Sequence, residues 1–414
     1  MSELTWQQPA DAPWGVAKLS KLAFEGVDLG PLRSQLLDKY VFEPENAAAL
    51  IDLAIIEQLL GNVEDGLARQ DEALRVRRLY RSPFADATPG LRLLAFAAAG
   101  DIGTNTPLEF LLEGSDIALE TLYIVPGEPL LETIPAHDLA IVAVGEGDAN
   151  QPVLDAIRRL IPTWPKPVLN HPDQIALLSR ERLCALMQPE AGIVIPMTAR
   201  IDRASLAAIG KGEAKLSAHL SDGAFPLIAR PIDSHAGRGL KKLDDAAAIA
   251  PYLAAQPERG FYISRYIDYR GAGGLFHKYR IVFIAGRAYA AHMAITDQWM
   301  IYYLNAAMGE SAEKRAEEAR FMAEFDEDFA RRHAVALDAL AQKIGLDYFG
   351  IDCAETPDGK LLLFEADIAM IVHAMDSPTI YPYKVPQMRK VFAAFGAMLK
   401  ARAASGSAQV HSAA

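Results

Sequence analysis

Two apolar strands near the C-terminal end of the chain carry acidic residues at their ends, and this pair restricts the fold more than any other segment. The first strand, at 345–352, ends in Asp352, and the second, at 361–367, ends with Glu365 and Asp367. Side chains alternate along a strand, so Glu365 and Asp367 share one face, and the two antiparallel strands each carry acids at their ends. Three carboxylates beside apolar residues repel one another unless a cation lies between them. Their oxygen atoms suit Mg²⁺ bridging phosphates, so we predict a metal site here; a solvated hairpin is the alternative.

Composition excludes several classes of protein. The chain has 414 residues, which predicts two to three domains, and its 51% hydrophobic and 23% charged residues are typical of a globular protein. The net charge of −12 disfavours nucleic-acid binding, which needs concentrated lysine and arginine. Cys184 and Cys353 form no disulfide framework or zinc motif, so we expect a cytoplasmic protein. No signal peptide is expected, and the most apolar runs are too short to span a membrane.

The N-terminal part has the pattern of packed helices. From Pro31 to about Leu79 apolar residues recur at helical spacing, and Gly61 with Asn62 interrupts the run. Alanines and a turn glycine let two helices pack as a hairpin, and the segment resembles about one unit of a tetratricopeptide repeat. Such a segment either binds a partner protein or a second copy of the chain, or forms a helical cap over the rest of the molecule.

Short apolar strands alternate with helices over residues 91–169, which predicts a parallel sheet wrapped by helices. In such sheets, ligands bind beyond the C-terminal ends of the strands. The loop at 100–107 follows the first of these strands. Its Asp101, Asn105 and Thr106 are therefore candidate substrate-binding residues, and a turn with a helix N-cap is the alternative for this loop.

The remainder of the chain mixes strands and helices, and several segments suit a nucleotide. The strand at 226–230 ends in Arg230 and is followed by a loop of small residues, which offers a phosphate both a cation and exposed backbone N–H groups. The strand at 261–268 can present backbone groups to an adenine edge. Arg280, on an otherwise apolar strand, needs an anionic partner if it is buried, and an internal ion pair is the alternative to a ligand. The charged helical stretch at 310–344 is expected to be a solvated face.

Taken in this order, the motifs resemble those of the ATP-grasp superfamily, particularly glutathione-synthetase-like and RimK-type ligases. The resemblance covers roughly residues 91–392 and depends on the order and spacing of the segments more than on any single motif. It implies an ATP-grasp fold, of the α/β and α+β classes, with a parallel-sheet domain before the nucleotide-binding domain. The expected domains are a helical tetratricopeptide-like domain at 1–88, a pre-ATP-grasp α/β domain at 89–190, an ATP-grasp domain at 191–395 and a flexible tail at 396–414.

The resemblance also implies roles for individual residues. Arg182 and Arg230 fall where phosphate-binding lysines are usual, and Arg280 falls where an arginine stabilises the transferred phosphate. Arg230 and Arg280 are therefore the expected catalytic residues. Asp352, Glu365 and Asp367 match the metal ligands of the family. The family commonly has asparagine at the position of Asp367. The loop with Ser234, His235, Gly237 and Gly239 matches the glycine-rich lid, and the segment with Arg265, Tyr266, Ile267 and Asp268 matches the adenine hinge. Apart from the resemblance, His292, Asp297 and Trp299 follow the strand of Arg280 and are candidate substrate-binding residues, with core or loop roles as the alternative.

Together these features imply an ATP-dependent carboxylate–amine ligase that uses Mg²⁺ and forms an amide bond through an acyl phosphate. The substrates would be an amino acid, a peptide or a related small molecule that supplies the carboxylate, and an amine. Two alternatives stay open: a catalytically weakened ATP-binding regulatory protein, suggested by arginine in place of both lysines, and an ATP-dependent phosphotransferase. No nucleic-acid or membrane partner is expected.

Overall fold

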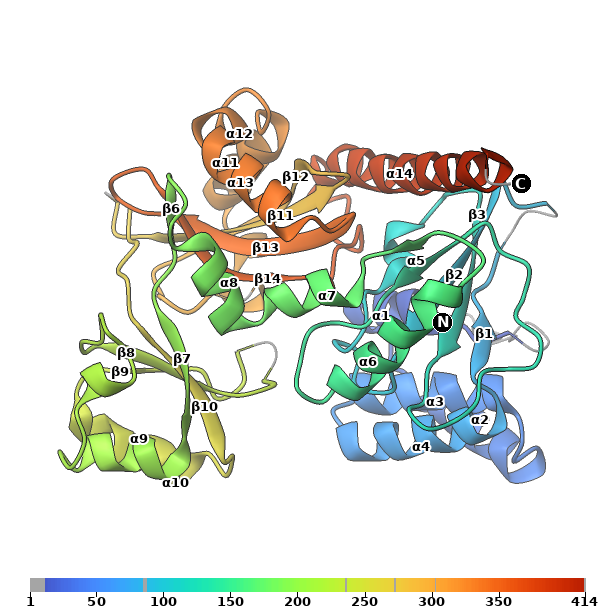
Figure 1. Ribbon diagram of the computed structural model, residues 1–414, viewed down its shortest axis with the longest axis horizontal. Helices are drawn as coiled ribbons and strands as arrows, with labels where there is room; N and C mark the ends of the chain where they lie inside the picture. The colour runs from blue at the N-terminus through green and yellow to red at the C-terminus, as the bar shows by residue number, and fades with distance from the viewer. Residues whose placement is uncertain (1–11, 85–87, 235–236, 272, 302, 413–414) are drawn as a thin grey trace.

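The computed structural model describes residues 12–84, 88–234, 237–271, 273–301 and 303–412, which form three β-sheets and a group of N-terminal helices (Figure 1). In Figure 1 the first sheet lies on the right above the N-terminal helices, the second at the lower left, and the third above the second. Buried apolar side chains of the first and third sheets belong to one continuous core, whereas the second sheet has its own. None of the helices in the described part of the chain is both long enough and apolar enough to cross a bilayer.

The N-terminal segment consists of α1 (Gly15–Phe24), α2 (Gly30–Phe42), α3 (Ala47–Leu59) and α4 (Val63–Val76). Asn46 caps α3, because its side chain accepts a hydrogen bond from the backbone N–H of Ala49 at 2.9 Å. Helices α3 and α4 approach closely where α4 has Gly66, since a Cβ atom there would lie 2.8 Å from the carbonyl oxygen of Ala54. The helical hairpin expected from the sequence is therefore present.

The packing of this helical segment leads to a stability prediction. Leu53 on α3 is fully buried in the helical core, whereas Val63 at the start of α4 is 43% exposed. We expect Leu53→Ala to lower the free energy of unfolding by about 2–5 kcal/mol, because buried methyl groups are lost and a cavity remains. The control Val63→Ala should change it by about 0.5 kcal/mol or less. Urea denaturation followed by circular dichroism measures both, and equally small effects would contradict the packing described.

The first sheet contains β1 (Leu79–Arg81), β2 (Leu91–Ala97), β3 (Ile117–Tyr123), β4 (Leu139–Val142) and β5 (Val168–Leu169), with α5 (Leu108–Leu111), α6 (Gln151–Leu160) and α7 (Pro172–Ile175) beside it. The strand order is β1-β3-β2-β4-β5, and all pairs are parallel except β1 with β3. Strand β4 is buried throughout, as expected in a sheet covered on both faces. The predicted parallel sheet is confirmed. The helical pattern was expected to reach Leu79, but α4 ends at Val76 because the next residues pair with β3.

The second sheet is antiparallel and contains β7 (Thr198–Asp202), β8 (Leu227–Pro231), β9 (Lys241–Leu243) and β10 (Gly260–Arg265), in the order β7-β10-β8-β9. Helices α9 (Arg203–Gly210) and α10 (Ile249–Ala255) cover one face, and residues of these helices and strands together form the separate core of this sheet. The fold thus places β8, which carries Arg230, in a layer distinct from the other two sheets.

The third sheet carries the two acidic strands. It contains β6 (Ile193–Val194), β11 (Phe276–Ile284), β12 (Arg287–Thr296), β13 (Tyr348–Glu355) and β14 (Leu361–Asp367), in the order β12-β11-β13-β14-β6. Helix α8 (Arg180–Met187) lies between the second and third sheets in Figure 1. The acidic strands β13 and β14 are antiparallel neighbours, as predicted.

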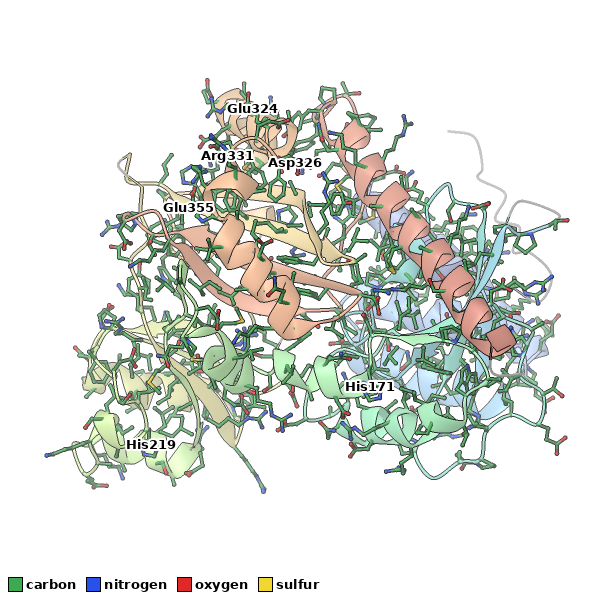
Figure 2. The ribbon with its side chains drawn as sticks, turned by 45° about the horizontal axis from the view of Figure 1, so that its top comes forward. His171, His219, Glu324, Asp326, Arg331 and Glu355 are labelled. Carbon is green, nitrogen blue, oxygen red and sulfur yellow. The ribbon has the colours of Figure 1, made fainter. Side chains whose placement is uncertain are left out.

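The charged stretch at 310–344 forms α11 (Ala312–Ala323), α12 (Phe329–Arg332) and α13 (Ala334–Ile344). Exposed charged residues at its outer end, labelled in Figure 2, are Glu324, Asp326 and Arg331. Glu318 on α11 is different: it is fully buried, accepts a hydrogen bond from the backbone N–H of Met293 at 3.1 Å, and pairs with Lys384 Nζ at 3.1 Å. The face is therefore solvated as predicted, except for one acid that belongs to the core.

The C-terminal end differs from the expected flexible tail at 396–414. Described residues up to 412 continue the helix α14 (Lys384–Ser412), which packs against β4, α5 and β12. Leu399 is fully buried, and Lys400 Nζ lies 2.7 Å from the Asp116 carboxylate. Alanine, which is frequent in this segment, favours helix, and buried apolar side chains such as Leu399 hold the helix in place.

Candidate functional site

Two carboxylates lie side by side where β13 and β14 pair. Asp352 on β13 is directly opposite Glu365 on β14, and a register shift next to Asp352 leaves Phe364 as an extra residue. Asp367 is opposite Gly350, two pairs further along the strands. Among the described residues, no group of three or more His, Cys, Asp or Glu side chains is placed to hold a metal ion. The predicted cluster of three acids is thus reduced to one neighbouring pair.

Asp352 is held by two cations of the neighbouring strand β11. Lys278 Nζ donates a hydrogen bond to Asp352 Oδ2 at 2.9 Å, and Arg280 Nε donates one to Oδ1 at 2.8 Å. Only 3% of the Asp352 side chain is exposed. Burial by itself would raise the pKa of Asp352, but the positive charges of Arg280 and Lys278 outweigh burial and hold the pKa well below its ordinary value. The ion pair that the sequence left open for Arg280 is therefore present, and Asp352 is an anion at neutral pH.

Glu365 is held by two arginines from distant parts of the chain. Arg180, the first residue of α8, forms an ion pair with Glu365 and donates a hydrogen bond to the carbonyl oxygen of Phe364 at 3.2 Å. Arg230, on β8, lies 3.8 Å from a carboxylate oxygen of Glu365. Burial, and then the positive charge of Arg180, lower the pKa of Arg230 to about 10. The charge of Arg230 is therefore only partly balanced by Glu365.

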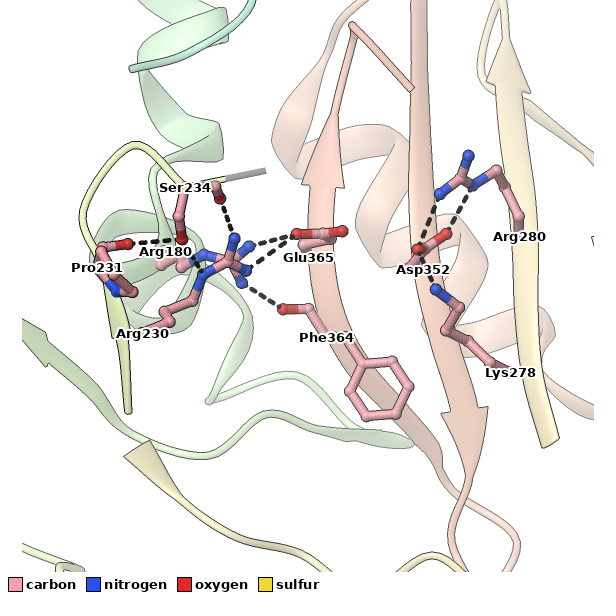
Figure 3. Close-up of polar contacts among 9 residues, drawn as sticks. All are labelled: Arg180, Arg230, Pro231, Ser234, Lys278, Arg280, Asp352, Phe364 and Glu365. Carbon is pink, nitrogen blue, oxygen red and sulfur yellow. Dashed lines mark hydrogen bonds and ion pairs between the residues drawn. The ribbon is translucent and has the colours of Figure 1, made fainter. Parts of the chain in front are cut away.

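These six side chains form what we call the cationic site (Figure 3). Its cations are Arg180, Arg230, Lys278 and Arg280, and its anions are Asp352 and Glu365. Four positive charges less two negative charges leave a net charge of +2. The four cationic side chains are between 12% and 24% exposed, so water balances this charge only in part. The arrangement favours a ligand with several negative charges, such as a polyphosphate.

The structure brings Arg180 into the site in place of Arg182. Arg182 is exposed and donates a hydrogen bond to the carbonyl oxygen of Ala176 at 3.3 Å. The two arginines are two residues apart at the start of a helix and so project in different directions. The direction of α8 decides which of its two arginines reaches Glu365.

The loop after β8, predicted to be a lid, is built around glycines. Gly237 and Gly239 have φ angles of +74° and +67°, and a Cβ atom on Gly239 would lie 2.7 Å from the ring of Pro231. Ser234 is buried and accepts a hydrogen bond at its Oγ from Arg230 Nε at 3.3 Å. The loop thus begins at a cation of the cationic site. Its predicted nucleotide contact at position 235, a histidine, lies outside the described residues.

The predicted adenine hinge follows β10. Tyr266 packs edge to face against Trp299, with ring centroids 5.9 Å apart, so two residues predicted for different ligands lie together. Arg265 has an aspartate 3.6 Å away, and Ile267 packs against the main core. Asp268 is exposed and forms an ion pair with the arginine two residues later. The described contacts of Arg265 and Asp268 are therefore with other protein charges.

The glycine-containing loop after β2 uses its polar side chains to hold its own shape. Asp101 accepts hydrogen bonds within the loop. The Asn105 amide pairs with both backbone groups of Ala98, at 2.9 and 2.8 Å. Thr106 Oγ1 donates to the carbonyl oxygen of Ile368 at 2.9 Å. These contacts favour the turn that the sequence left open for this loop, and they join it to the end of β14.

The remaining substrate candidates lie on and after β12. His292 is opposite Arg280 in the sheet, and burial, followed by the charge of Arg280, lowers its pKa well below the ordinary value. A neutral imidazole therefore lies next to the cationic site. Asp297 accepts hydrogen bonds from Thr296 and Gln298, at 3.3 and 3.2 Å, in an exposed turn.

Glu146, in the loop after β4, was not singled out from the sequence. Burial, and then the negative charges of Glu181 and Asp367, raise its pKa to about 7. The same loop contacts the residue directly before the predicted lid, because Asp233 accepts a hydrogen bond from the backbone N–H of Asp148 at 3.1 Å. A carboxyl group that titrates near neutral pH can exchange protons with a ligand. The available signal was an acid in the loop that follows a fully apolar strand.

The raised pKa of Glu146 has a measurable consequence for stability. The folded pKa of about 7 exceeds the ordinary 4.5, so the folded chain binds more protons and its stability falls as the pH rises from about 4.5 to 7. We expect Glu146→Gln to reduce that decline. Urea midpoints across this pH range, without divalent cations, measure the effect, with Glu324→Gln at the exposed helix end as control. Parallel pH profiles for wild type and Glu146→Gln would contradict the burial of this carboxyl.

Two solved structures are similar to this chain. The RimK domain protein ATP-grasp from Sphaerobacter thermophilus DSM 20745 shares 15% identity, with a TM-score of 0.40, over 74% of this chain and 98% of that one. The VanG D-Ala:D-Ser ligase from Enterococcus faecalis shares 14% identity, with a TM-score of 0.44, over the same fractions. No protein-family model matches this sequence, and neither does any curated protein sequence. At these values the likeness concerns the fold alone, so the chemistry of the site rests on its own contacts.

Proposed function

We propose that this chain is an ATP-grasp enzyme, an ATP-dependent carboxylate–amine ligase that joins a small carboxylate to an amine. One observation carries the proposal: four cations surround two adjacent carboxylates, with a net charge of +2, in a half-buried site. A nucleoside triphosphate supplies the missing negative charge. The segments that build the site follow one another along the chain in the order expected from the motifs, from α8 through β8 and β11 to β13 and β14.

The cations would bind phosphate by exchanging partners. Arg180 and Arg230 contact Glu365, and Lys278 and Arg280 contact Asp352 (Figure 3). Phosphate oxygens offer the same cations a similar acceptor, and charge-assisted bonds to phosphate are strong. Arg280 in particular would neutralise charge that develops on the transferred phosphoryl group.

Asp352 and Glu365 would hold Mg²⁺, because this ion is commonly bound by one or two carboxylates together with phosphate oxygens. The pair fits that requirement, since the two acids are direct cross-strand neighbours and Glu365 is 35% exposed. Mg²⁺ binding by this pair does not require Asp367. Bound Mg²⁺ would supply positive charge to the phosphates, in addition to that of the four side chains.

The reaction would proceed in two balanced steps. A substrate carboxylate oxygen forms a bond to the γ-phosphorus while the bond from that phosphorus to the β,γ-bridging oxygen breaks, which releases ADP. The amine then attacks the acyl carbon, phosphate leaves, and the amine proton passes to a base, for which Glu146 is our candidate. The loop that contains Gly237 and Gly239 would exclude water from the acyl phosphate.

The two arginines of α8 provide a matched pair of variants. Arg180→Ala should weaken ATP binding by roughly 10- to 100-fold, as expected for the loss of a hydrogen bond to a charged group. Arg182→Ala should change it by less than about 2-fold, because Arg182 contacts a carbonyl oxygen outside the site. Isothermal titration with a non-hydrolysable ATP analogue and Mg²⁺ measures both. Equal losses, or a larger loss for Arg182→Ala, would contradict the placement of Arg180.

The reaction class is tested by product mass. Purified protein is incubated with ATP, Mg²⁺ and a panel of amino acids and short peptides, and ADP release is followed for each carboxylate with and without an amine. Amide formation that requires both substrates supports a ligase. A phosphorylated compound as the final product indicates the phosphotransferase alternative, and nucleotide binding with no turnover on any substrate indicates the regulatory alternative.

A further inference from the structure

A second pocket lies between the N-terminal helices and the first sheet. It has a volume of about 120 Å³. Parallel pairing puts Ala95 and Ala97 of β2 next to Thr121 and Tyr123 of β3, and alternation directs all four to the same face. All four line the pocket. The space exists because two alanines occupy positions where larger side chains would fill it.

The helical segment and the loop after β2 close the pocket together. Gln70 on α4 accepts a hydrogen bond from the backbone N–H of Gly100 at 2.7 Å, and Gln58 on α3 accepts one from Ile102 at 3.0 Å. Both glutamines line the pocket. The pocket therefore depends on the N-terminal helices, which favours their role as a cap over the first sheet.

The side chains that line the pocket in the described part of the chain include two acids and no cationic residue. Glu109 on α5 accepts hydrogen bonds from the backbone N–H of Ala17 at 2.9 Å and from Ser82 Oγ at 3.0 Å. Asp101 is a second acid in its wall, and no lysine, arginine or histidine of the described chain lines it. Burial raises the pKa of Glu109, and the hydrogen bonds from Ala17, Ser82 and the backbone N–H of Val16 offset this only in part. A buried carboxylate in such surroundings is stabilised by a cation.

Two hydroxyl groups in the same wall add hydrogen-bonding capacity. Within the described residues, no protein group hydrogen-bonds to the side-chain hydroxyl of Thr121 or Tyr123. Burial, and then the charge of Glu109, raise the pKa of Tyr123 to about 12, so this group stays protonated. The pocket thus combines a carboxyl group, two hydroxyl groups and a small apolar floor.

We propose that this pocket binds a small organic ammonium compound of about six non-hydrogen atoms, with its charged group at Glu109 and its apolar part against Ala95 and Ala97. The size follows from the volume, because a cavity of roughly 150 Å³ accommodates a ligand as large as benzene. The chemical class follows from the carboxylate that lacks a cation. This site is separate from the cationic site and goes beyond the proposed ligase activity.

The test uses the full chain without ATP, so its outcome is independent of the proposed reaction. Pentylammonium chloride, 1-pentanol and sodium butyrate have similar size and differ in charge. By isothermal titration we expect pentylammonium to bind at least about 10-fold more tightly than 1-pentanol, and butyrate not to bind. A thermal shift with the same probes provides a second readout.

Variants locate the binding. Glu109→Gln should remove the preference for pentylammonium over 1-pentanol. Ala97→Leu, or the smaller change Ala95→Val, fills the space and should therefore weaken the binding of both compounds by about 10-fold or more. Glu120→Gln, on the opposite face of β3, is the control and should bind as wild type does. Urea denaturation verifies that each variant is folded.

Three results would overturn the proposal. One is the absence of pentylammonium binding at millimolar concentration. Another is equal affinity for the three probes, and the third is binding that Glu109→Gln and the filling variants leave unchanged while they remain folded. A crystal structure with pentylammonium at Glu109 would support it directly.

Discussion

Glu365→Gln is expected to reduce ATP turnover by about 100-fold or more while leaving the chain folded. The substitution keeps the size of the side chain and removes the negative charge that Arg180 and Arg230 contact. A metal bound there would lose a carboxylate ligand, and removing one preorganised electrostatic group typically costs 10²- to 10³-fold in rate. Because two arginines then lack their anion, we expect nucleotide without Mg²⁺ to bind at least as tightly as to wild type.

The measurement separates these two effects. Steady-state ADP release at varied Mg²⁺ gives the turnover and the metal dependence, and titration with ADP in the presence of a chelator gives the metal-free affinity. Glu324→Gln, at an exposed helix end, is the control and should match wild type in both. A Glu365→Gln variant with wild-type turnover would remove this carboxylate from the proposed chemistry.

Asp352→Asn is expected to destabilise the fold as well as abolish turnover. Asp352 is buried and balances Lys278 and Arg280, so the variant leaves two cations in the sheet without their anion. Breaking a buried ion pair in this way typically costs about 3–5 kcal/mol. Asp326→Asn, which removes one exposed ion pair with Arg287, should cost about 1 kcal/mol or less. Urea denaturation at neutral pH measures both variants.

The pH dependence of Asp352→Asn gives a further check. The folded pKa of Asp352 lies below its ordinary value, so its stabilising effect is present above pH of about 4 and is lost as the pH falls below that. The stability curves of wild type and variant should therefore converge in acid. Curves that stay apart by a constant amount would show that the charge of Asp352 is not the cause of the difference.

Local patterns in the sequence identified most elements of the fold. The parallel sheet followed from short apolar strands that alternate with helices, and the acidic hairpin followed from apolar runs that end in acids on either side of a turn. Strand β1 was missed because three residues carry too little periodicity, and they become a strand only by pairing with β3. The helix α14 was missed where alanine and serine suggested a tail, because its burial against β4 and α5 is a contact between distant residues.

Local sequence patterns also predicted part of the candidate site. Arg230, Arg280, Asp352 and Glu365 were identified because each ends or interrupts an apolar strand, and they do meet in the structure. Asp367 lies opposite Gly350, two pairs beyond the pair formed by Asp352 and Glu365, and no residue pattern specifies this strand register.

Residue types and their spacing by themselves determined that this chain has two acid-bearing strands, a parallel sheet and a helical hairpin, because hydrophobic periodicity is a property of neighbouring residues. Only the tertiary structure decided that Arg180 and not Arg182 contacts Glu365, that Lys278 completes the cationic site, that the pKa of Glu146 is raised to about 7, and that a pocket lies beneath the N-terminal helices. Each of these depends on charges or surfaces that are far apart in the sequence, and electrostatic balance and burial arise only when the fold brings them together.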